Sequence, residues 1–283
     1  MKKIKKPVLI TASVFLVVAL LILAATALFP LLQANTTENI DDLDWEFTAE
    51  GDNYYLTLRC KSFDRMIRAV HILPDAENRT MALEAEICGI PFFGLYQPKE
   101  QRISIGNSTE THPPREITLN GFVLYQDGVV IHPYVAGLYA LSTHYIGDVS
   151  QNQKILRRLW RVLDTNPLAD VTYELKTSET PYEWTINVGY DQGFVSEEQK
   201  NTELKKDACV LLALIGNMDA VIWNTEVDGK ADSLRFDTSE AQALLGKDVK
   251  TYGESAAGLQ SLMEQLQYVG PAETLYFNYL NEE

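Results

Sequence analysis

The sequence lacks the residue patterns that most catalytic and metal-binding sites use. It has only three cysteines and four histidines, and neither a Cys-x-x-Cys nor a His-Glu-x-x-His arrangement occurs. It also lacks a Gly-x-Ser-x-Gly elbow, a Ser-x-x-Lys pair, a phosphate-binding P-loop and a Gly-x-Gly-x-x-Gly loop. We therefore expect a protein that is not an enzyme and that carries no metal ion or other cofactor.

Positive charge is scarce outside the first six residues. The 24 Lys and Arg residues include four N-terminal lysines, so 20 remain from residue 36 onward, where all 39 Asp and Glu residues lie. This part of the chain has a net charge of about −19, and we expect it to be repelled by nucleic acid and by anionic lipid.

An uncharged, mostly apolar run, Val8–Leu32, follows a cluster of lysines. A helix of that length, at about 1.5 Å per residue, spans a hydrocarbon core of about 30 Å. A basic cluster beside such a run stays on the cytoplasmic side. The pattern predicts a single-pass protein of the cell membrane, with a cytoplasmic N-terminus and extracytoplasmic C-terminal domains. The lysines are Lys2, Lys3, Lys5 and Lys6.

The apolar run also contains a pattern typical of signal-peptide cleavage, Ala25-Thr26-Ala27. Cleavage there would release the rest of the chain. Apolar residues continue past this site from Leu28 to Leu32, which a cleaved signal does not need. We therefore favour a retained anchor, with cleavage as the alternative.

The spacing of apolar residues and the composition divide the chain into five segments. The membrane anchor is followed by a polar linker, a β-rich extracytoplasmic domain, an α+β domain and a C-terminal tail. The boundaries are 1–34, 35–44, 45–136, 137–268 and 269–283.

The segment 45–136 has apolar residues at alternate positions, as in Tyr54-Leu56-Leu58, with turn residues between the runs. Asp127-Gly128, between two apolar runs, predicts a hairpin with a type I′ turn. Short antiparallel strands at this spacing predict a β-sandwich-like domain.

The segment 137–268 changes to a helical period after Tyr145. Ser150 and Gln153 suggest a capping box at the start of one helix, and Leu204–Ile215 predicts a second, buried helix. A hairpin follows each helix, and the second turns at Asp228-Gly229. The whole chain is therefore predicted as α+β: an N-terminal transmembrane helix, a β-sandwich-like domain, and an α+β domain with helix-hairpin-helix-hairpin order.

This second segment resembles a bacterial family of unknown function, number 4825. The resemblance covers about residues 120–266, and its best anchor is Tyr145-Ile146-Gly147-Asp148 before a helix. The sequence departs from the family pattern at Val149-Ser150, where a more polar continuation is expected. The resemblance implies a Gram-positive protein that is membrane-anchored or fused to sensor peptidases of the BlaR/MecR type, and it implies no activity. Further matching stretches are Tyr125-Gln126-Asp127-Gly128, Tyr173–Thr177, Pro181-Tyr182 and Leu211–Asn217.

Two features suggest binding. The Tyr145–Asp148 block precedes a helix N-terminus, where backbone N–H groups favour an anion; alternatively, it is a turn in which Gly147 takes an unusual φ and Asp148 supports the first turn. The same helix carries cations at i, i+3, i+4 and i+7, which either meet an anionic partner or are solvated or paired with carboxylates of the same domain. The candidate binding residues are Tyr145, Gly147, Asp148, Lys154, Arg157, Arg158 and Arg161.

The three cysteines make an odd number for an exported protein. A Cys60–Cys88 disulfide is one alternative, but the alternation of their strands places the two side chains on different faces. We favour three free thiols, with Cys209 as the third.

Together these features predict a membrane-anchored extracytoplasmic binding or accessory module that acts in envelope-stress or antibiotic sensing. Its partners would be the lipid bilayer, through the N-terminal helix, and a membrane sensor protein or cell-wall ligand. An unrecognised cell-envelope hydrolase and a structural spacer are the alternatives.

Overall fold

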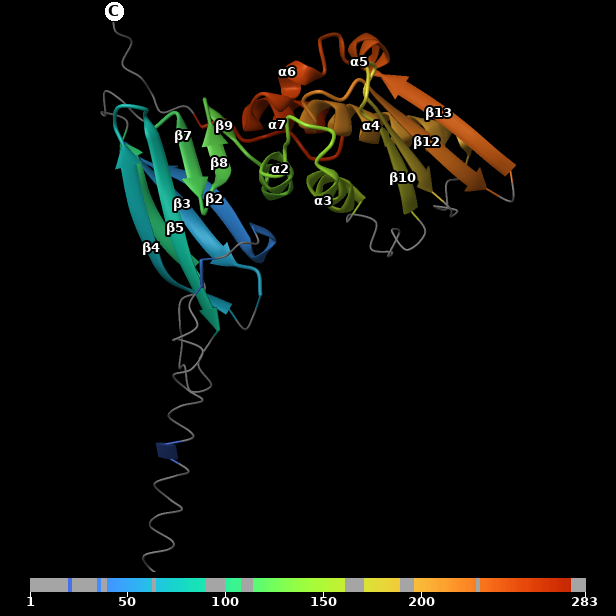
Figure 1. The fold of residues 1–283 in the computed structure, drawn as a ribbon. Helices are drawn as coiled ribbons and strands as arrows, with labels where there is room; N and C mark the ends of the chain where they lie inside the picture. The colour runs from blue at the N-terminus through green and yellow to red at the C-terminus, as the bar shows by residue number, and fades with distance from the viewer. Residues whose placement is uncertain are drawn as a thin grey trace, which may run out of the picture. The chain divides into compact units, whose positions relative to one another are not determined.

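The computed structural model describes residues 20–21, 35–36, 40–62, 65–89, 100–107, 114–160, 171–188, 196–227 and 230–275. The chain is a mixed α+β protein with several sheets, which confirms the predicted class. It divides into two compact units, which are described separately (Figure 1). The first comprises Met1–Pro114 and Phe277–Glu283, and the second comprises Arg115–Tyr276.

The expected membrane anchor lies outside the described residues, apart from Leu20 and Leu21. Among the described residues, no helix combines the length and the apolar composition that crossing a bilayer requires. Anchorage through Val8–Leu32 therefore stays a prediction.

The first unit contains a three-stranded antiparallel sheet in the order β2-β3-β6. Its strands are β2 (Leu43–Glu50), β3 (Asn53–Cys60) and β6 (Glu100–Asn107). The alternation read from Tyr54-Leu56-Leu58 is confirmed, because all three side chains are buried.

A long hairpin completes this unit. It joins β4 (Arg65–Asp75) to β5 (Thr80–Gly89), and the short β1 (Asn35–Thr36) also pairs with β5. A 3-10 helix, η1 (Ile40–Asp42), precedes β2. The three cysteines are free and buried, which confirms the favoured prediction, and Cys60 and Cys88 lie on strands of different sheets.

The second unit begins with a small antiparallel ladder made of β7 (Glu116–Leu119), β8 (Phe122–Gln126) and β9 (Val129–Val130). Asp127 and Gly128 between β8 and β9 have φ of 48° and 96°, as the predicted type I′ turn requires. The sequence assigns this hairpin to the β-rich segment, but its core contacts are with helices of the second unit. The Gln126 side chain accepts from the backbone N–H of Ala257 at 3.1 Å.

One helix stands at the centre of the second unit. It is α4, which begins after the Ser196 N-cap, and its apolar half from Ala208 to Ile215 is buried on every side, as predicted. It contacts two strands and four other helices. The helices of this unit are α2 (Pro133–Tyr139), α3 (Val149–Trp160), α4 (Glu197–Leu214), α5 (Thr238–Leu245), α6 (Lys250–Gly253) and α7 (Ala256–Gln265).

The C-terminal end of α4 is closed by a lysine from α6. Lys250 Nζ donates to the carbonyl oxygens of Leu212, Ile215 and Met218 at 2.6, 2.8 and 2.6 Å. An ammonium group has three N–H donors, so each finds a carbonyl acceptor at or just beyond the end of the helix. Burial lowers the pKa of Lys250 to about 8.

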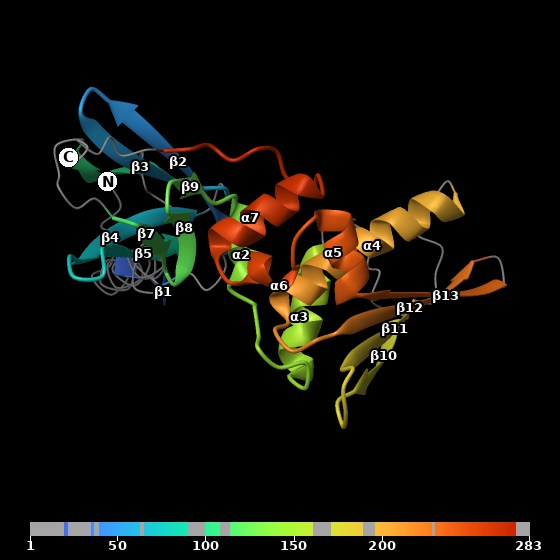
Figure 2. The ribbon, with the colours of Figure 1, turned by 90° about the horizontal axis from the view of Figure 1, so that it is seen from above.

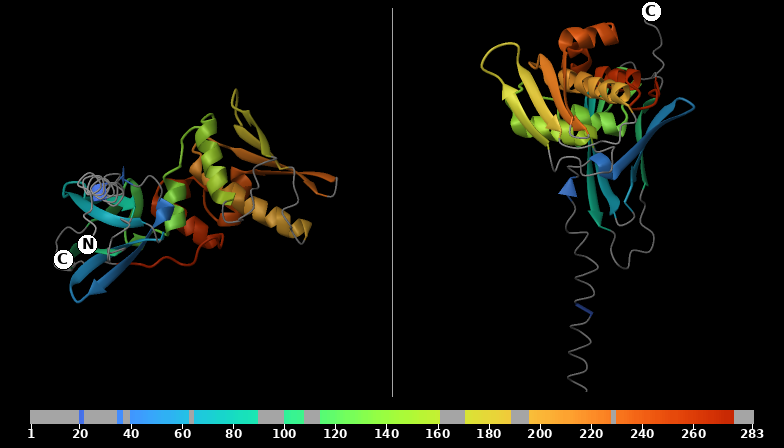
Figure 3. Two further views of the ribbon diagram at one scale, coloured as in Figure 1. Left: turned by 90° about the horizontal axis from the view of Figure 1, so that it is seen from below. Right: turned by 90° about the vertical axis from the view of Figure 1, so that its right-hand side faces the viewer.

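The second unit also contains a four-stranded sheet in the order β10-β11-β12-β13 (Figure 2). The two hairpins are as the sequence predicts, but β11 and β12 pair in parallel, so they form one sheet with α4 as the crossover. Helix α4 lies against one face of this sheet (Figure 3). The strands are β10 (Val171–Lys176), β11 (Glu183–Val188), β12 (Ala220–Val227) and β13 (Lys230–Asp237).

Candidate functional site

The two faces of the four-stranded sheet differ in character. In β11, Trp184, Ile186 and Val188 are buried on the face that α4 covers, while Glu183, Thr185 and Asn187 alternate with them. The other strands continue this division through their registers. Polar side chains therefore gather on the uncovered face.

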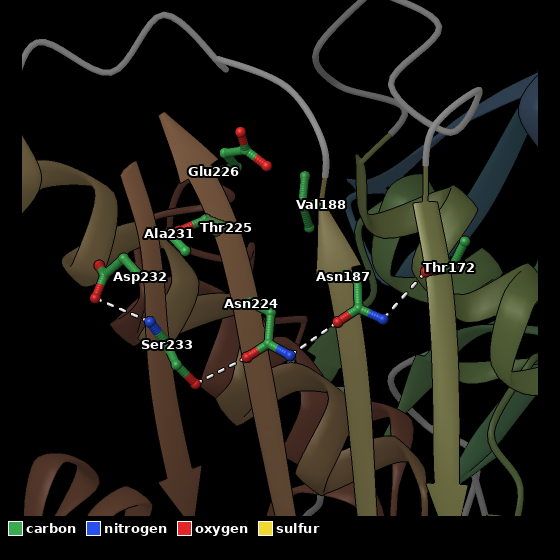
Figure 4. Close-up of a pocket in the computed structure, with 9 residues that line it drawn as sticks. All are labelled: Thr172, Asn187, Val188, Asn224, Thr225, Glu226, Ala231, Asp232 and Ser233. Atoms are coloured by element: carbon green, nitrogen blue, oxygen red, sulfur yellow. Dashed lines mark hydrogen bonds between the residues drawn. The ribbon is translucent and has the colours of Figure 1, made fainter. Parts of the chain in front are cut away.

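A continuous row of polar side chains crosses all four strands on the uncovered face. Thr172, Asn187, Asn224 and Ser233 are paired in register from strand to strand, and we call them the polar row. Ser233 Oγ donates to Asn224 Oδ1 at 2.8 Å, Asn224 Nδ2 to Asn187 Oδ1 at 2.8 Å, and Asn187 Nδ2 to Thr172 Oγ1 at 3.1 Å (Figure 4). The donors thus all point from β13 towards β10.

The polar row forms one wall of an open pocket of about 620 Å³. The pocket lies at the carboxyl ends of the parallel strands β11 and β12 (Figure 4). Residues from both faces of the sheet line it. Besides the polar row, its lining residues are Val188, Thr225, Glu226, Ala231 and Asp232.

The rim of the pocket carries more negative than positive charge. Lys200 on α4 is buried, and its Nζ lies 2.6 Å from Asp232 Oδ2 and 3.4 Å from Thr225 Oγ1. Asp232 therefore neutralises the lysine, while Glu226, which also lines the pocket, is exposed. The pocket thus disfavours anions.

The far end of the uncovered face is occupied by ion pairs. Arg235 contacts Glu183 at 3.1 Å and Asp237 at 2.7 Å, and Lys176 lies 3.9 Å from Glu183. These charges satisfy one another, whereas the polar row is uncharged. The row and its pocket are therefore the candidate site on this face.

The sequence-predicted block Tyr145–Asp148 forms the turn into α3. Asp148 Oδ1 accepts from the backbone N–H of Gln151 at 3.1 Å, so Asp148 caps the helix. The prediction of a cap at Ser150 is wrong: α3 already begins at Val149, and Ser150 lies in its first turn.

Gly147 does not have the unusual φ that the turn interpretation assigned to it, because its φ is not in the left-handed region. A Cβ at this position would lie 2.2 Å from Cε1 of Tyr145, so a larger residue here requires the Tyr145 ring to move. The Tyr145 ring is 58% exposed. Ile146 between them is buried and donates its backbone N–H to Asn217 Oδ1 at 2.7 Å.

The predicted basic face of α3 is divided. Lys154 and Arg157 are exposed, and no ion pair joins either to another described residue. Arg158 is engaged within the unit: its guanidinium lies 5.8 Å from the Tyr134 ring centre and fills the space beside Gly137. Arg161 lies outside the described residues. The structure therefore places these cations on the fold without bringing four of them into one site.

The titratable groups with the largest pKa shifts serve the interior of the second unit. Burial raises the pKa of Asp207 to about 6, although Tyr268 Oη and Trp160 Nε1 both donate to it. Burial and the charge of Asp207 raise the pKa of Tyr268, and burial raises the pKa of Cys209 to about 12. None of these residues lines the pocket.

Within the described part of the chain, no three His, Cys, Asp or Glu side chains are grouped closely enough to hold a metal ion. The polar row offers amide and hydroxyl groups, which bind ligands by hydrogen bonds. This arrangement suits hydrogen bonding to a neutral ligand.

The sequence analysis missed the polar row. Each member stands at an ordinary alternate position of a hairpin, and four such positions occur in many sheets. The only local signal is the alternation of Asn187 and Asn224 with buried residues. The parallel register that joins them depends on α4.

Residues 138–238 match the model of the family described as domain of unknown function DUF4825. This confirms the resemblance to family number 4825 and places every residue that lines the pocket inside the matched region. Strands β2 to β6 of the first unit lie outside it. The chain matches no curated protein and no solved structure.

Proposed function

We propose that this chain, which carries a DUF4825 domain over residues 138–238, is an extracytoplasmic binding module held at the cell membrane by Val8–Leu32. Its ligand would occupy the pocket beside the polar row. The observation that carries this proposal is the unbroken row of neutral hydrogen-bonding side chains across four strands.

The position of the pocket supports a binding role. Ligands of open α/β sheets bind outside the carboxyl ends of parallel strands, and this pocket lies at the carboxyl ends of β11 and β12. Binding is favoured over catalysis because the strongly shifted groups Asp207 and Lys250 are occupied by hydrogen bonds within the fold. The proposed role is therefore that of a non-enzymatic accessory or sensing component of an envelope-stress or antibiotic response.

Retention of envelope material tests the binding role. The full chain, immobilised in detergent, is incubated with wall fragments and membrane extract, beside an Asn224→Leu variant. We expect wild-type protein to retain a component that the variant does not retain, because a leucine side chain can neither donate nor accept a hydrogen bond. Thr185→Ala, on the same face outside the row, is the matched control. Equal retention by wild type and Asn224→Leu would contradict the binding role of the pocket.

Fractionation tests the anchor. We expect the full-length protein in the membrane fraction, with its C-terminal domains digested by protease added outside intact cells. A mature protein that begins at Leu28, as determined by N-terminal sequencing, and that is found in the medium would contradict the anchor.

A test in the producing cell addresses sensing. Asn224→Leu, introduced at the native locus, should weaken the transcriptional response to a wall-active antibiotic, whereas Thr185→Ala should leave it unchanged. An unaltered response in Asn224→Leu cells would leave binding intact as a proposal and remove its sensing role.

A further inference from the structure

Strand β10 is one edge of the four-stranded sheet, and β11 is its only neighbour among the described strands (Figure 2). In that part of the chain, all backbone hydrogen bonds of β10 go to β11. An edge strand presents a row of N–H and C=O groups with which another strand can pair. The outer side of β10 therefore offers a place for a further strand.

The apolar, covered face of the sheet is incomplete at β10. Val171, Tyr173 and Leu175 are paired in register with buried residues of β11, so they lie on that face. They are themselves only half-buried. A strand added at this edge would cover them, and the burial of their apolar surface would stabilise the pairing.

The two edges of the sheet differ in how well they are protected from pairing. β10 contains no proline, its register with β11 has no bulge, and it places no charge on the covered face. On β13, by contrast, Asp232 lies on the covered face and pairs with Lys200 of α4. An inward-pointing charge discourages pairing, so β10 is the edge suited to a further strand.

The exposed face of β10 carries charges that match a second copy of the same strand. Glu174 and Lys176 are two residues apart on this face. A two-fold axis through the edge makes the paired strands antiparallel and keeps both covered faces on one side. With the axis at Leu175, Glu174 of each copy faces Lys176 of the other. With the axis at Glu174 or at Lys176, like charges face each other, which is unfavourable.

Both charged residues are available for such pairs. No ion pair joins Glu174 to another described residue. Lys176 Nζ lies 3.9 Å from Glu183, which Arg235 contacts at 3.1 Å. Arg235 therefore keeps Glu183 paired when the Lys176 ammonium turns towards Glu174 of a second copy.

We propose that the chain forms a two-fold symmetric dimer through antiparallel pairing of β10 with β10 of a second copy, with Leu175 at the axis and Glu174 facing Lys176 across it. The two four-stranded sheets then become one continuous sheet. The pairing covers Tyr173–Thr177, so Thr172 and the pocket stay outside it. The dimer depends neither on the ligand of the pocket nor on the membrane anchor.

A cysteine at the axis locates the pairing. Opposite residues of an antiparallel pair have Cα atoms about 4.5–5.5 Å apart, which a disulfide spans. Leu175→Cys in the full chain, oxidised in detergent solution, should therefore give a covalent dimer on a non-reducing gel. The three native cysteines are buried and should give none. Tyr173→Cys is the matched control on the same face, because its two copies would lie about 14 Å apart.

Exchange of charges tests the register. Glu174→Lys alone and Lys176→Glu alone each set like charges against each other at both pairs. Each should raise the dissociation constant of the dimer about tenfold, measured by sedimentation velocity of the full chain in detergent. An equimolar mixture of the two variants should associate with about the wild-type constant, because every pair across the mixed dimer again joins opposite charges.

A control and a folding check accompany these variants. Glu198→Lys makes the same change of charge on the exposed first turn of α4 and should leave the dissociation constant within about twofold of wild type. Unchanged circular dichroism verifies that all variants fold.

The contrary outcomes are distinct. A monomeric wild type without a Leu175→Cys dimer overturns the proposal, and cross-linking through Tyr173→Cys instead overturns the register. A dimer that is indifferent to both charge changes forms through another surface. If the wild type is monomeric and Glu174→Lys loses the retained envelope component, a strand of another protein pairs with β10. The pocket is tested separately by Asn224→Leu, so its binding role stands or falls independently.

Discussion

Lys200 Nζ on α4 lies 2.6 Å from Asp232 Oδ2 on β13. Lys200 is a charged side chain that is buried. Its own side chain is 6% exposed and that of Asp232 is 36% exposed. The pair therefore fixes α4 to the sheet at the pocket. Breaking it affects the buried lysine more than the partly exposed aspartate.

Removing the acid should cost more stability than removing the lysine charge. Asp232→Ala leaves a buried ammonium without its counter-ion, and we expect a loss of about 2 kcal/mol, below the value for wholly buried pairs because Asp232 is partly exposed. Lys200→Met keeps the aliphatic packing and removes the charge, so its loss should be smaller. Urea denaturation followed by tryptophan fluorescence measures both, and a larger loss in Lys200→Met would contradict this account.

The pocket illustrates where prediction from the sequence ends. Both hairpins and the buried half of α4 follow from local periodicity and turn residues, and the structure has them at the predicted places. The parallel pairing of Asn187 with Asn224 depends instead on α4, which connects the two hairpins and packs against one face of their common sheet. No pattern within either hairpin specifies that long-range register.

The start of α3 shows a second limit. The sequence correctly indicates a helix after Gly147, but Ser150 and Asp148 both suit a cap. Which of the two residues caps the helix depends on the position of Ile146. Its backbone N–H donates a hydrogen bond to Asn217, which is distant in the sequence. In the sequence, Arg158 likewise belongs to a basic stripe. In the structure, its guanidinium instead packs inside the unit, in the space beside Gly137.

Asp207 should make stability depend on pH. Its pKa of about 6 in the folded state lies above the ordinary 3.8, so between these values the folded state binds more protons than the unfolded state. Stability should therefore rise as the pH falls from about 7 towards 4, by about 3 kcal/mol from this group. Urea denaturation across this range measures the slope.

Asp207→Asn isolates this contribution, because an amide does not titrate there. The variant should lose the Asp207 part of the slope and be no less stable than wild type at pH 7. Glu198→Gln, on the exposed first turn of the same helix, removes the same charge and should keep the slope. A wild-type slope in Asp207→Asn would show that another group is responsible.

Lys250 should be essential for closing the end of α4. Lys250→Met leaves the carbonyls of Leu212, Ile215 and Met218 without their common donor, and we expect a loss of about 3 kcal/mol. Lys247→Met removes the same charge, and with it the contact of Lys247 Nζ at 3.6 Å from the Tyr252 ring centre. That control should cost at most about 1 kcal/mol. Thermal unfolding measures both losses of stability. Similar losses in the two variants would mean that water replaces Lys250 as the hydrogen-bond donor to the three carbonyls.

Two glycines should respond very differently to the same added methyl group. A Cβ on Gly253 of α6 would lie 1.8 Å from the backbone oxygen of Ala213 on α4, so one of the two backbones must shift. Gly253→Ala should therefore force α6 away from α4, withdraw Lys250 from its carbonyls, and cost about 3 kcal/mol or more.

Gly147→Ala is the matched substitution, because the three atoms nearest its Cβ all belong to the side chain of Tyr145, which is exposed and can swing into solvent. We expect a cost below about 1 kcal/mol. Urea midpoints of both variants, compared with wild type, measure the difference. If Gly253→Ala unfolds at the wild-type midpoint, close contact between α6 and α4 is not what holds Lys250 at the end of the central helix.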